Sequence, residues 1–330
     1  MSQLLESLIL YALEWDTSDI HFVLKDGHLA IHFKTQLGME PIDQDIWDTR
    51  LFEYLKYIAG FDLTNPFKPQ SGQFSFQVQD SSLYCRFSYL KNKNMETGVL
   101  RLLRTNVSLK IQELTSNAGH IQFLNSLTKK RQGLIITSGP TNSGKTTTLH
   151  ALLHAIAQEG IYNVMTLEDP IEIEDDLYIQ LQINEASGFT YERGIEELLR
   201  HDPDVILIGE TRNEYTARML IRAALTGHLV FTTLHAKNAL ESILRLKDLG
   251  VSDMDLKDTL SAILSQRLYM AKDRKECVYE ILKQEELDYA IEHKAYPKGH
   301  RTLEKEIMDA LESGSIDDSQ ALFDLEDYQR

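Results

Sequence analysis

The stretch Gly139-Pro140-Thr141-Asn142-Ser143-Gly144-Lys145-Thr146 decides the fold of this 330-residue chain. It satisfies the pattern G-x-x-x-x-G-K-S/T, which marks a phosphate-binding loop when a strand precedes it and a helix follows it. Both are indicated here, since Leu134-Ile135-Ile136 is an apolar strand pattern and apolar residues repeat at helical spacing between Leu149 and Ile156. We therefore expect a nucleotide to bind at this loop.

The residue types in the loop suit a triphosphate. The two glycines let successive backbone N–H groups face one anion, and the N-terminus of the following helix adds its dipole. Lys145 places a cation on the β- and γ-phosphates, and Thr146 supplies a hydroxyl ligand for Mg²⁺. We expect ATP and Mg²⁺ as ligands, with the nucleotide contacted by Gly139, Pro140, Thr141, Asn142, Ser143, Gly144, Lys145, Thr146 and Thr147.

Acidic side chains follow two other apolar strand patterns. Glu210 comes after residues 205–208, and the stretch Glu168-Asp169-Pro170-Ile171-Glu172 comes after residues 164–167. The carboxyl ends of parallel strands meet at one edge of a sheet, so these carboxylates should lie beside the phosphate loop. We predict that Glu210 holds Mg²⁺ and that Glu168 orients or deprotonates the attacking water. Without the loop, each would be interpreted as a solvated carboxylate.

Two histidines flank a further strand, His228 before it and His235 after it. Seven residues of extended chain separate them by roughly 20 Å, so we expect no metal ion shared between them. His235 falls at the same predicted sheet edge as Glu168 and Glu210. We predict that it senses the γ-phosphate, with a purely structural histidine as the alternative.

The patterns around the loop predict three parts of the chain. Strand and helix patterns alternate from Gly133 onward, as in a largely parallel sheet covered by helices. Upstream, a helix is predicted over residues 3–14, followed by short alternating strands with turns such as Asp26-Gly27. We predict an α+β domain over 1–105, a linker over 106–118 and an α/β domain over 119–330 with a helical, acidic end. A further helix is predicted from Leu256, Leu260, Ile263, Leu264 and Leu268.

Composition excludes several classes of protein. The chain has 34 Lys and Arg against 50 Asp and Glu, a net charge of −16, and 42% hydrophobic residues, which suffices for packed cores and argues against disorder. Much of the acidic excess lies in residues 302–330 and disfavours bulk attraction to nucleic acid. The N-terminal apolar stretch is shorter than the roughly 20 residues that cross a bilayer, and no basic signal start precedes it. The two cysteines, Cys85 and Cys277, lie far apart in the sequence and form no disulfide framework, which fits a reducing compartment. Together these features predict a cytoplasmic location.

The ordered motifs resemble the secretion, type IV pilus and competence ATPases of the GspE/PilB/PilT group. Ser18-Asp19-Ile20-His21 is similar to the group's N-terminal signature, residues 168–172 to its Asp box, 199–212 to its Walker B element and 226–235 to its His box. The resemblance therefore covers most of the chain. It implies a homo-hexamer in which a PAS-like N-terminal domain precedes a RecA-like P-loop core, with ATP bound between the two and hydrolysed.

The resemblance also implies arginines of the N-terminal domain that stabilise the transferred phosphoryl group. Arg86, Arg101 and Arg104 are the candidates, although each alone would be interpreted as a surface arginine. Type II secretion members carry paired CxxC motifs for zinc, but only Cys277 lies in that region here, so we expect no zinc. Without the paired CxxC motifs, the chain resembles the members of the group that assemble a competence pseudopilus. The resemblance implies that an integral membrane platform protein is the partner and that this chain associates with the cytoplasmic face of the membrane.

Three other interpretations stay open. A pilus retraction ATPase would share most of these motifs. A nucleic-acid motor of the RecA/helicase type would share the loop and sheet but would need a basic track, for which only Lys129-Lys130-Arg131 is a compact candidate. A nucleotide-dependent scaffold that does not hydrolyse ATP is the third. The acidic net charge disfavours the nucleic-acid motor and direct nucleic-acid binding.

Overall fold

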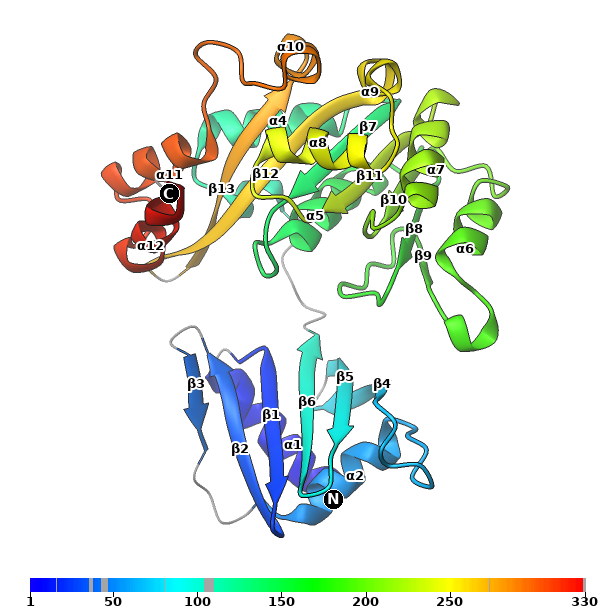
Figure 1. Cartoon of the computed structure of the whole chain (residues 1–330), viewed down its shortest axis with the longest axis vertical. Helices are drawn as coiled ribbons and strands as arrows, with labels where there is room; N and C mark the ends of the chain where they lie inside the picture. The colour runs from blue at the N-terminus through cyan, green and yellow to red at the C-terminus, as the bar shows by residue number, and fades with distance from the viewer. Residues whose placement is uncertain are drawn as a thin grey trace. The chain divides into compact units, whose positions relative to one another are not determined.

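The computed structural model describes residues 1–15, 17–35, 38–42, 47–79, 81–103, 110–272 and 274–328. The chain divides into two compact units, Met1–Asn106 and Val107–Arg330, which Figure 1 shows in cartoon form. Both combine helices with sheets, so the α/β class of the whole chain is confirmed. None of the helices in the described ranges has the length and apolar content that a bilayer-spanning helix requires.

The first unit is an antiparallel sheet with two helices on one face. Its strand order is β3-β2-β1-β6-β5-β4, and Figure 1 shows α1 and α2 together on one side of these strands. Apolar residues of both helices, such as Leu8 and Phe52, pack with Phe22 and Phe87 of the sheet in one core. The elements are α1 (Ser2–Glu14), β1 (Asp19–Lys25), β2 (His28–Thr35), β3 (Gly38–Pro41), α2 (Thr49–Ile58), β4 (Gln70–Val78), β5 (Ser81–Lys91) and β6 (Met95–Leu103).

The predicted helix and hairpin of this unit are confirmed. The helix predicted over 3–14 is α1, and it buries one face because its apolar residues recur at helical spacing. Asp26 and Gly27 join β1 to β2 with φ angles of 51° and 80°. Two left-handed residues in succession match the twist of the flanking strands, which explains why Asp-Gly closes this hairpin.

The second unit is built on a mixed seven-stranded sheet of order β13-β12-β7-β11-β10-β8-β9. All neighbouring pairs are parallel except β12 and β13. Its strands are β7 (Gly133–Ser138), β8 (Val164–Glu168), β9 (Ile179–Gln182), β10 (Val205–Ile208), β11 (Leu229–Leu234), β12 (Leu260–Ala271) and β13 (Arg274–Lys283). The largely parallel sheet predicted from Gly133 onward is thus confirmed.

Helices cover both faces of this sheet (Figure 1). Leu134 and Ile136 of β7 face one core, while Ile135 between them faces the other. The first core is covered by α6 (Tyr191–Leu198), α7 (Glu214–Leu225), α8 (Ala239–Asp248), α9 (Asp253–Thr259) and α10 (Glu285–His293). The second is covered by α3 (Ile111–Leu114), α4 (Ala118–Leu127) and α5 (Lys145–Ala157). A short helix η1 (Glu185–Ser187) and the terminal helices α11 (Leu303–Glu312) and α12 (Asp318–Tyr328) complete the unit.

The helix predicted from Leu256 to Leu268 is wrong. Helix α9 ends at Thr259 and strand β12 begins at Leu260, so Ile263, Leu264 and Leu268 lie in a strand. Ile263 packs into the first core and Leu264 into the second. A central strand buried on both faces is apolar almost throughout, and such a run can imitate helical spacing over a few residues.

The strand order brings the functional segments to one edge of the sheet. Strands β7, β11, β10 and β8 are neighbours and run parallel, so their carboxyl ends lie side by side. The phosphate loop follows β7, His235 follows β11, Glu210 follows β10, and Glu168 ends β8. This is the edge at which open α/β sheets bind their ligands.

Candidate functional site

The phosphate loop adopts a backbone that its glycines make possible. Gly139 and Gly144 have φ angles of 147° and 83°. A Cβ on Gly139 would lie 2.5 Å from the backbone oxygen of Gln266 and 2.6 Å from the Ser143 hydroxyl, so a larger residue cannot fit. Asn142 also has a positive φ, of 65°. Asparagine tolerates that conformation better than most residues, which explains why the loop can accommodate it at this position.

Lys145 is the buried cation of the loop. Helix α5 begins at this residue, which is only 8% exposed. The Nζ of Lys145 donates to the backbone oxygens of Gly139 at 3.0 Å and Pro140 at 2.7 Å. Burial lowers the pKa of Lys145, whereas the negative charges of Glu210 and Glu172 oppose that shift. An ammonium held by two weak neutral acceptors is available to an anion that enters the loop.

The loop fits a bound phosphate in two further respects. The Ser143 hydroxyl is buried and has no hydrogen-bond partner among the described residues. Orphaned buried hydroxyls are costly, so an anion that accepted from Ser143 would relieve the cost. Thr146 and Thr147 lie half-buried in the first turn of α5, and Pro140, Thr141 and Asn142 are exposed. The hydroxyl of Thr146 is of the oxygen class that Mg²⁺ prefers.

A strand distant in sequence holds the loop in place. The Nε2 of Gln266 in β12 donates to the backbone oxygen of Ser143 at 2.6 Å, and Arg267 donates to the backbone oxygen of Gln266. No sequence motif pointed to Gln266, because its segment is part of the stretch misinterpreted as a helix. This contact clamps the turn of the loop on which Ser143 lies.

Glu210 and His235 lie together at the sheet edge. His235 Nε2 is 3.5 Å from Glu210 Oε1, and Arg212 Nη2 is 2.7 Å from Glu210 Oε2. Burial and the nearby charge of Lys145 both lower the pKa of His235, and Glu210 acts in the opposite direction. The structure thus brings Lys145, Glu210 and His235 into one electrostatic cluster. Arg212 was not among the predicted site residues, although its sequence neighbourhood Gly-Glu-Thr-Arg contained it.

The acidic stretch after β8 divides into a buried part and an exposed part. Glu168 is 3% exposed and its Oε1 accepts from Thr166 Oγ1 at 2.6 Å and from Gln180 Nε2 at 3.3 Å. Glu172 is exposed, and its charge acts on the pKa of Lys145. Glu172 is therefore a second acid that acts on Lys145, and the sequence motif predicted no role for it.

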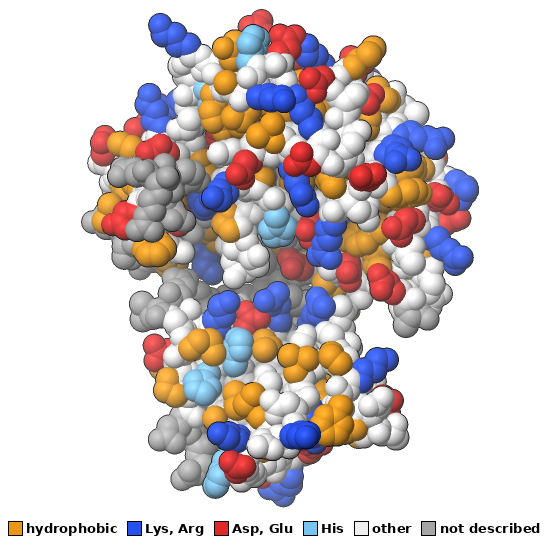
Figure 2. Space-filling view, viewed as in Figure 1, with side chains coloured by type: hydrophobic (Ala, Val, Ile, Leu, Met, Phe, Trp, Pro, Cys, Tyr) orange, Lys and Arg blue, Asp and Glu red, His pale blue; other side chains and the backbone are white. Residues whose placement is uncertain are grey.

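Two of the candidate arginines, Arg86 and Arg101, lie in a row of charged residues across the sheet of the first unit. Cross-strand partners place Lys34 opposite Asp19, Asp19 opposite Arg101, and Arg101 opposite Arg86. Figure 2 shows Lys and Arg side chains with an acid among them at the upper end of this sheet. Arg101 Nε donates to Asp19 at 2.7 Å, and Arg86 Nε donates to Ser71 at 3.2 Å. Like charges that face each other directly, as on Arg101 and Arg86, are destabilising, so an anion beside them would be favoured. The third candidate, Arg104, lies outside the described residues.

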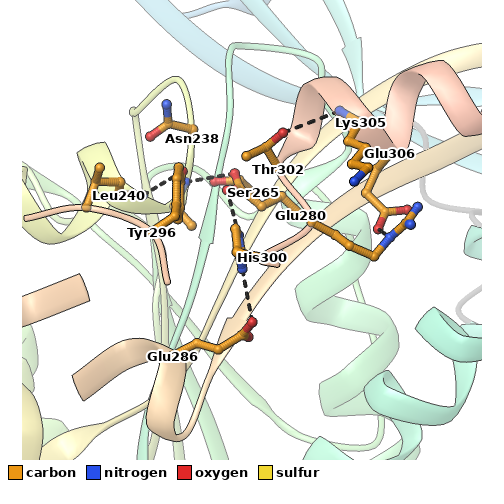
Figure 3. A network of polar contacts seen from close by, with 12 residues as sticks. Asn238, Leu240, Ser265, Glu280, Glu286, Tyr296, His300, Thr302, Lys305 and Glu306 are labelled. Carbon is orange, nitrogen blue, oxygen red and sulfur yellow. Dashed lines mark hydrogen bonds and ion pairs between the residues drawn. The ribbon is translucent and has the colours of Figure 1, made fainter. Parts of the chain in front are cut away.

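A buried network supports the loop that follows His235. Glu280 of β13 is fully buried and accepts from the backbone N–H of Ala239 at 3.0 Å, which is in the first turn of α8. His300 lies between two carboxylates (Figure 3). Its Nε2 is 3.2 Å from Glu280 Oε1, and its Nδ1 is 3.2 Å from Glu286 Oε1. Burial alone would lower the pKa of His300, but the hydrogen bonds to the two carboxylates outweigh it and raise the pKa.

We expect this network to make stability depend on pH. Because the pKa of His300 is raised on folding, its contribution is fully present below the unfolded value of about 6.5 and is lost as pH rises through the folded value. His300→Gln should therefore lower the melting temperature most at about pH 6, by roughly 2–4 °C for each kcal/mol lost. Melting curves from pH 5.5 to 9 measure it. A difference between wild type and variant that grows with pH would contradict the expectation.

Comparison with known proteins places the chain among secretion proteins. The profile of the family described as Type II/IV secretion system protein matches residues 1–312. Competence protein ComGA of Bacillus subtilis is 36% identical over 253 residues, which are 76% of this chain and 71% of the relative. Competence protein ComGA of Halalkalibacterium halodurans is 38% identical over 80% of this chain and 77% of the relative. Type II secretion system protein E of Klebsiella pneumoniae is 37% identical over 81% of this chain, but only 54% of that protein is covered.

Solved structures share the fold. The crystal structure of the pilus retraction motor PilT with bound ADP superposes with a TM-score of 0.76 and 26% identity, over 97% of this chain and 96% of that one. The ATPase DotB of Legionella pneumophila gives a TM-score of 0.76 at 21% identity, over 94% of this chain and 92% of that one. The likeness to DotB is one of fold.

Proposed function

The chain belongs to the Type II/IV secretion system protein family, whose members include secretion and pilus ATPases, and we propose that it hydrolyses Mg·ATP to drive assembly of a pilus-like apparatus. Two relatives that match over most of their length are named competence proteins. Their similarity supports assembly of a competence pseudopilus for DNA uptake over retraction, since the retraction motor is only 26% identical.

One observation carries the nucleotide site. Lys145 lies buried in a glycine-lined loop, with the orphaned Ser143 hydroxyl beside it and the charge of Glu210 acting on it. We infer that Lys145 releases the carbonyls of Gly139 and Pro140 and donates to the β- and γ-phosphates of ATP. Backbone N–H groups of the loop bind the same oxygens. This pairing replaces weak neutral acceptors by a strong charged one.

Thr146 and Glu210 are the proposed ligands of Mg²⁺, which when bound neutralises phosphate charge. Glu210 is ion-paired with Arg212, so taking up a cation would require that pair to loosen. His235, whose lowered pKa favours the neutral ring, would donate its ring N–H to an oxygen of the γ-phosphate. Glu168 is proposed to orient the attacking water, with Glu172 as the competing candidate.

Arg86, Arg101 and Arg104 are proposed to stabilise charge on the transferred phosphoryl group. The opposed pair Arg86 and Arg101 supports this, because an anion would relieve their mutual repulsion. Following the family, we propose a homo-hexamer of subunits with a PAS-like first unit and a RecA-like second unit. In this proposal ATP binding moves the two units relative to one another, and loss of the γ-phosphate reverses that motion. A membrane platform protein would receive the motion.

Phosphate release by purified protein tests the proposed function. We expect steady ATP hydrolysis in Mg²⁺ that changes less than about twofold when single-stranded DNA is added, because the chain carries a net charge of −16. Hydrolysis that requires DNA would favour the nucleic-acid motor. Nucleotide binding without any turnover would instead indicate a scaffold, and would contradict the proposal.

A further inference from the structure

A second buried histidine connects the helix of the phosphate loop to the acidic strand end. His150 lies in α5, five residues after Lys145, and its side chain is fully buried. Its Nε2 is 3.2 Å from Glu168 Oε2, and its Nδ1 is 2.6 Å from the hydroxyl of Tyr178. The two rings also lie near each other, with centroids 6.1 Å apart. The contacts form a continuous chain from Tyr178 through His150 to Glu168.

The chemistry of the three groups assigns the direction of each hydrogen bond. An ionised Glu168 carboxylate can only accept, so His150 Nε2 carries a proton and donates it to Oε2. A neutral imidazole that carries its proton on Nε2 accepts at Nδ1. The Nδ1 of that ring therefore accepts from the Tyr178 hydroxyl, which keeps its proton because burial raises its pKa strongly.

The Glu168 carboxylate has an acceptor position that the contact with His150 does not fill. An ionised carboxylate has about four acceptor positions, two on each oxygen. Within the part of the chain that the structure describes, Glu168 Oε1 accepts from Thr166 and Gln180, while Oε2 accepts only from His150. One position on Oε2 therefore remains for a further donor. A water molecule that donates there would be held in a direction set by the other three contacts.

We propose that His150 is a positioning residue, which with Tyr178 orients the Glu168 carboxylate so that one position of Oε2 faces the attacking water. The inference rests on the proposed role of Glu168 in ATP hydrolysis. His150 and Lys145 belong to the same rigid helix, so the cation on the phosphates and the donor to the carboxylate move together. His150 acts through Glu168 and touches no substrate.

Substitutions at His150 separate this role from simple packing. His150→Leu removes both polar contacts and should lower kcat about tenfold, with KM changed less than about twofold, since the loss is of one charged hydrogen bond. His150→Gln should retain at least a third of wild-type kcat. Its amide N–H can donate to Glu168 while its amide oxygen accepts from Tyr178, as the imidazole does.

Two further variants guard against a trivial result. Tyr178→Phe keeps the buried ring but removes the hydroxyl that fixes the imidazole, and should lower kcat about threefold to tenfold even if His150→Leu folds poorly. His154→Gln is the matched control, one turn further along α5. His154 contacts Asp175 rather than Glu168. We therefore expect the His154→Gln variant to hydrolyse ATP like wild type. Melting temperature and ADP affinity confirm that each variant is folded.

The outcomes distinguish the proposed role of His150 from the function on which it rests. Equal loss in His150→Leu and His150→Gln would show that the ring matters only for packing, and would overturn the proposal. Wild-type turnover in folded His150→Leu and Tyr178→Phe would overturn it too. If the wild-type protein itself hydrolyses no ATP, the proposed function fails first, and the role of His150 fails with it.

Discussion

Lys145→Ala is expected to reduce ATP hydrolysis by about 100-fold or more. The change removes the buried cation that stabilises negative charge developing on the transferred phosphoryl group, in a site where water cannot replace it. Its present acceptors are backbone oxygens of Gly139 and Pro140, so among the described residues the substitution breaks no side-chain ion pair. Initial rates of phosphate release at saturating Mg·ATP measure the effect.

Lys129→Ala is the matched control for this prediction. Lys129 is exposed and lies just before the phosphate-loop strand, so the same truncation there should leave the rate within about twofold. Melting curves of both variants exclude a loss of folded protein. Near-normal turnover in folded Lys145→Ala would mean that the site is assigned to the wrong residues.

Glu168→Gln is expected to retain ATP binding but to lower kcat about 100-fold or more. Glutamine keeps the size of the side chain but cannot take a proton from water. In addition, its amide N–H₂ cannot accept from Thr166, Gln180 or His150 as an ionised oxygen does. Single-turnover hydrolysis measured beside nucleotide affinity separates the chemical step from binding.

Glu172→Gln is the informative companion of that variant. Both acids come from the same short stretch, but Glu172 is exposed and Glu168 is buried. If Glu172→Gln loses turnover while Glu168→Gln hydrolyses ATP normally, the water-orienting acid is Glu172. In that case the assignment of Glu168, and with it the role of His150, is wrong.

Features that depend on neighbours in the chain could be predicted from the sequence. The glycine positions of the phosphate loop, the hairpin at Asp26-Gly27 and helix α1 follow from local backbone and periodicity rules. The order of strands also placed Glu210 and His235 near Lys145, because residues that follow parallel strands gather at one edge. Their catalytic roles stay predictions.

Contacts between distant parts of the chain could not be predicted in this way. Gln266 clamps Ser143 across 123 residues, and its segment was predicted as a helix because apolar spacing in a doubly buried strand is ambiguous. His150 belongs to none of the sequence motifs, and helical spacing alone gives it no role. Its partners Tyr178 and Glu168 become visible only once β8 and the segment after it fold against α5. Arg212 likewise acquires a meaning only through its ion pair with Glu210.

Isothermal titration calorimetry of the wild-type chain with a slowly hydrolysed ATP analogue and Mg²⁺ tests the central claim, that the loop around Ser143 binds the phosphates of a nucleotide. The account predicts saturable binding at about one site per chain, weakened strongly in Lys145→Ala. Absence of binding by well-folded wild-type protein, or equal binding by both proteins, would contradict it.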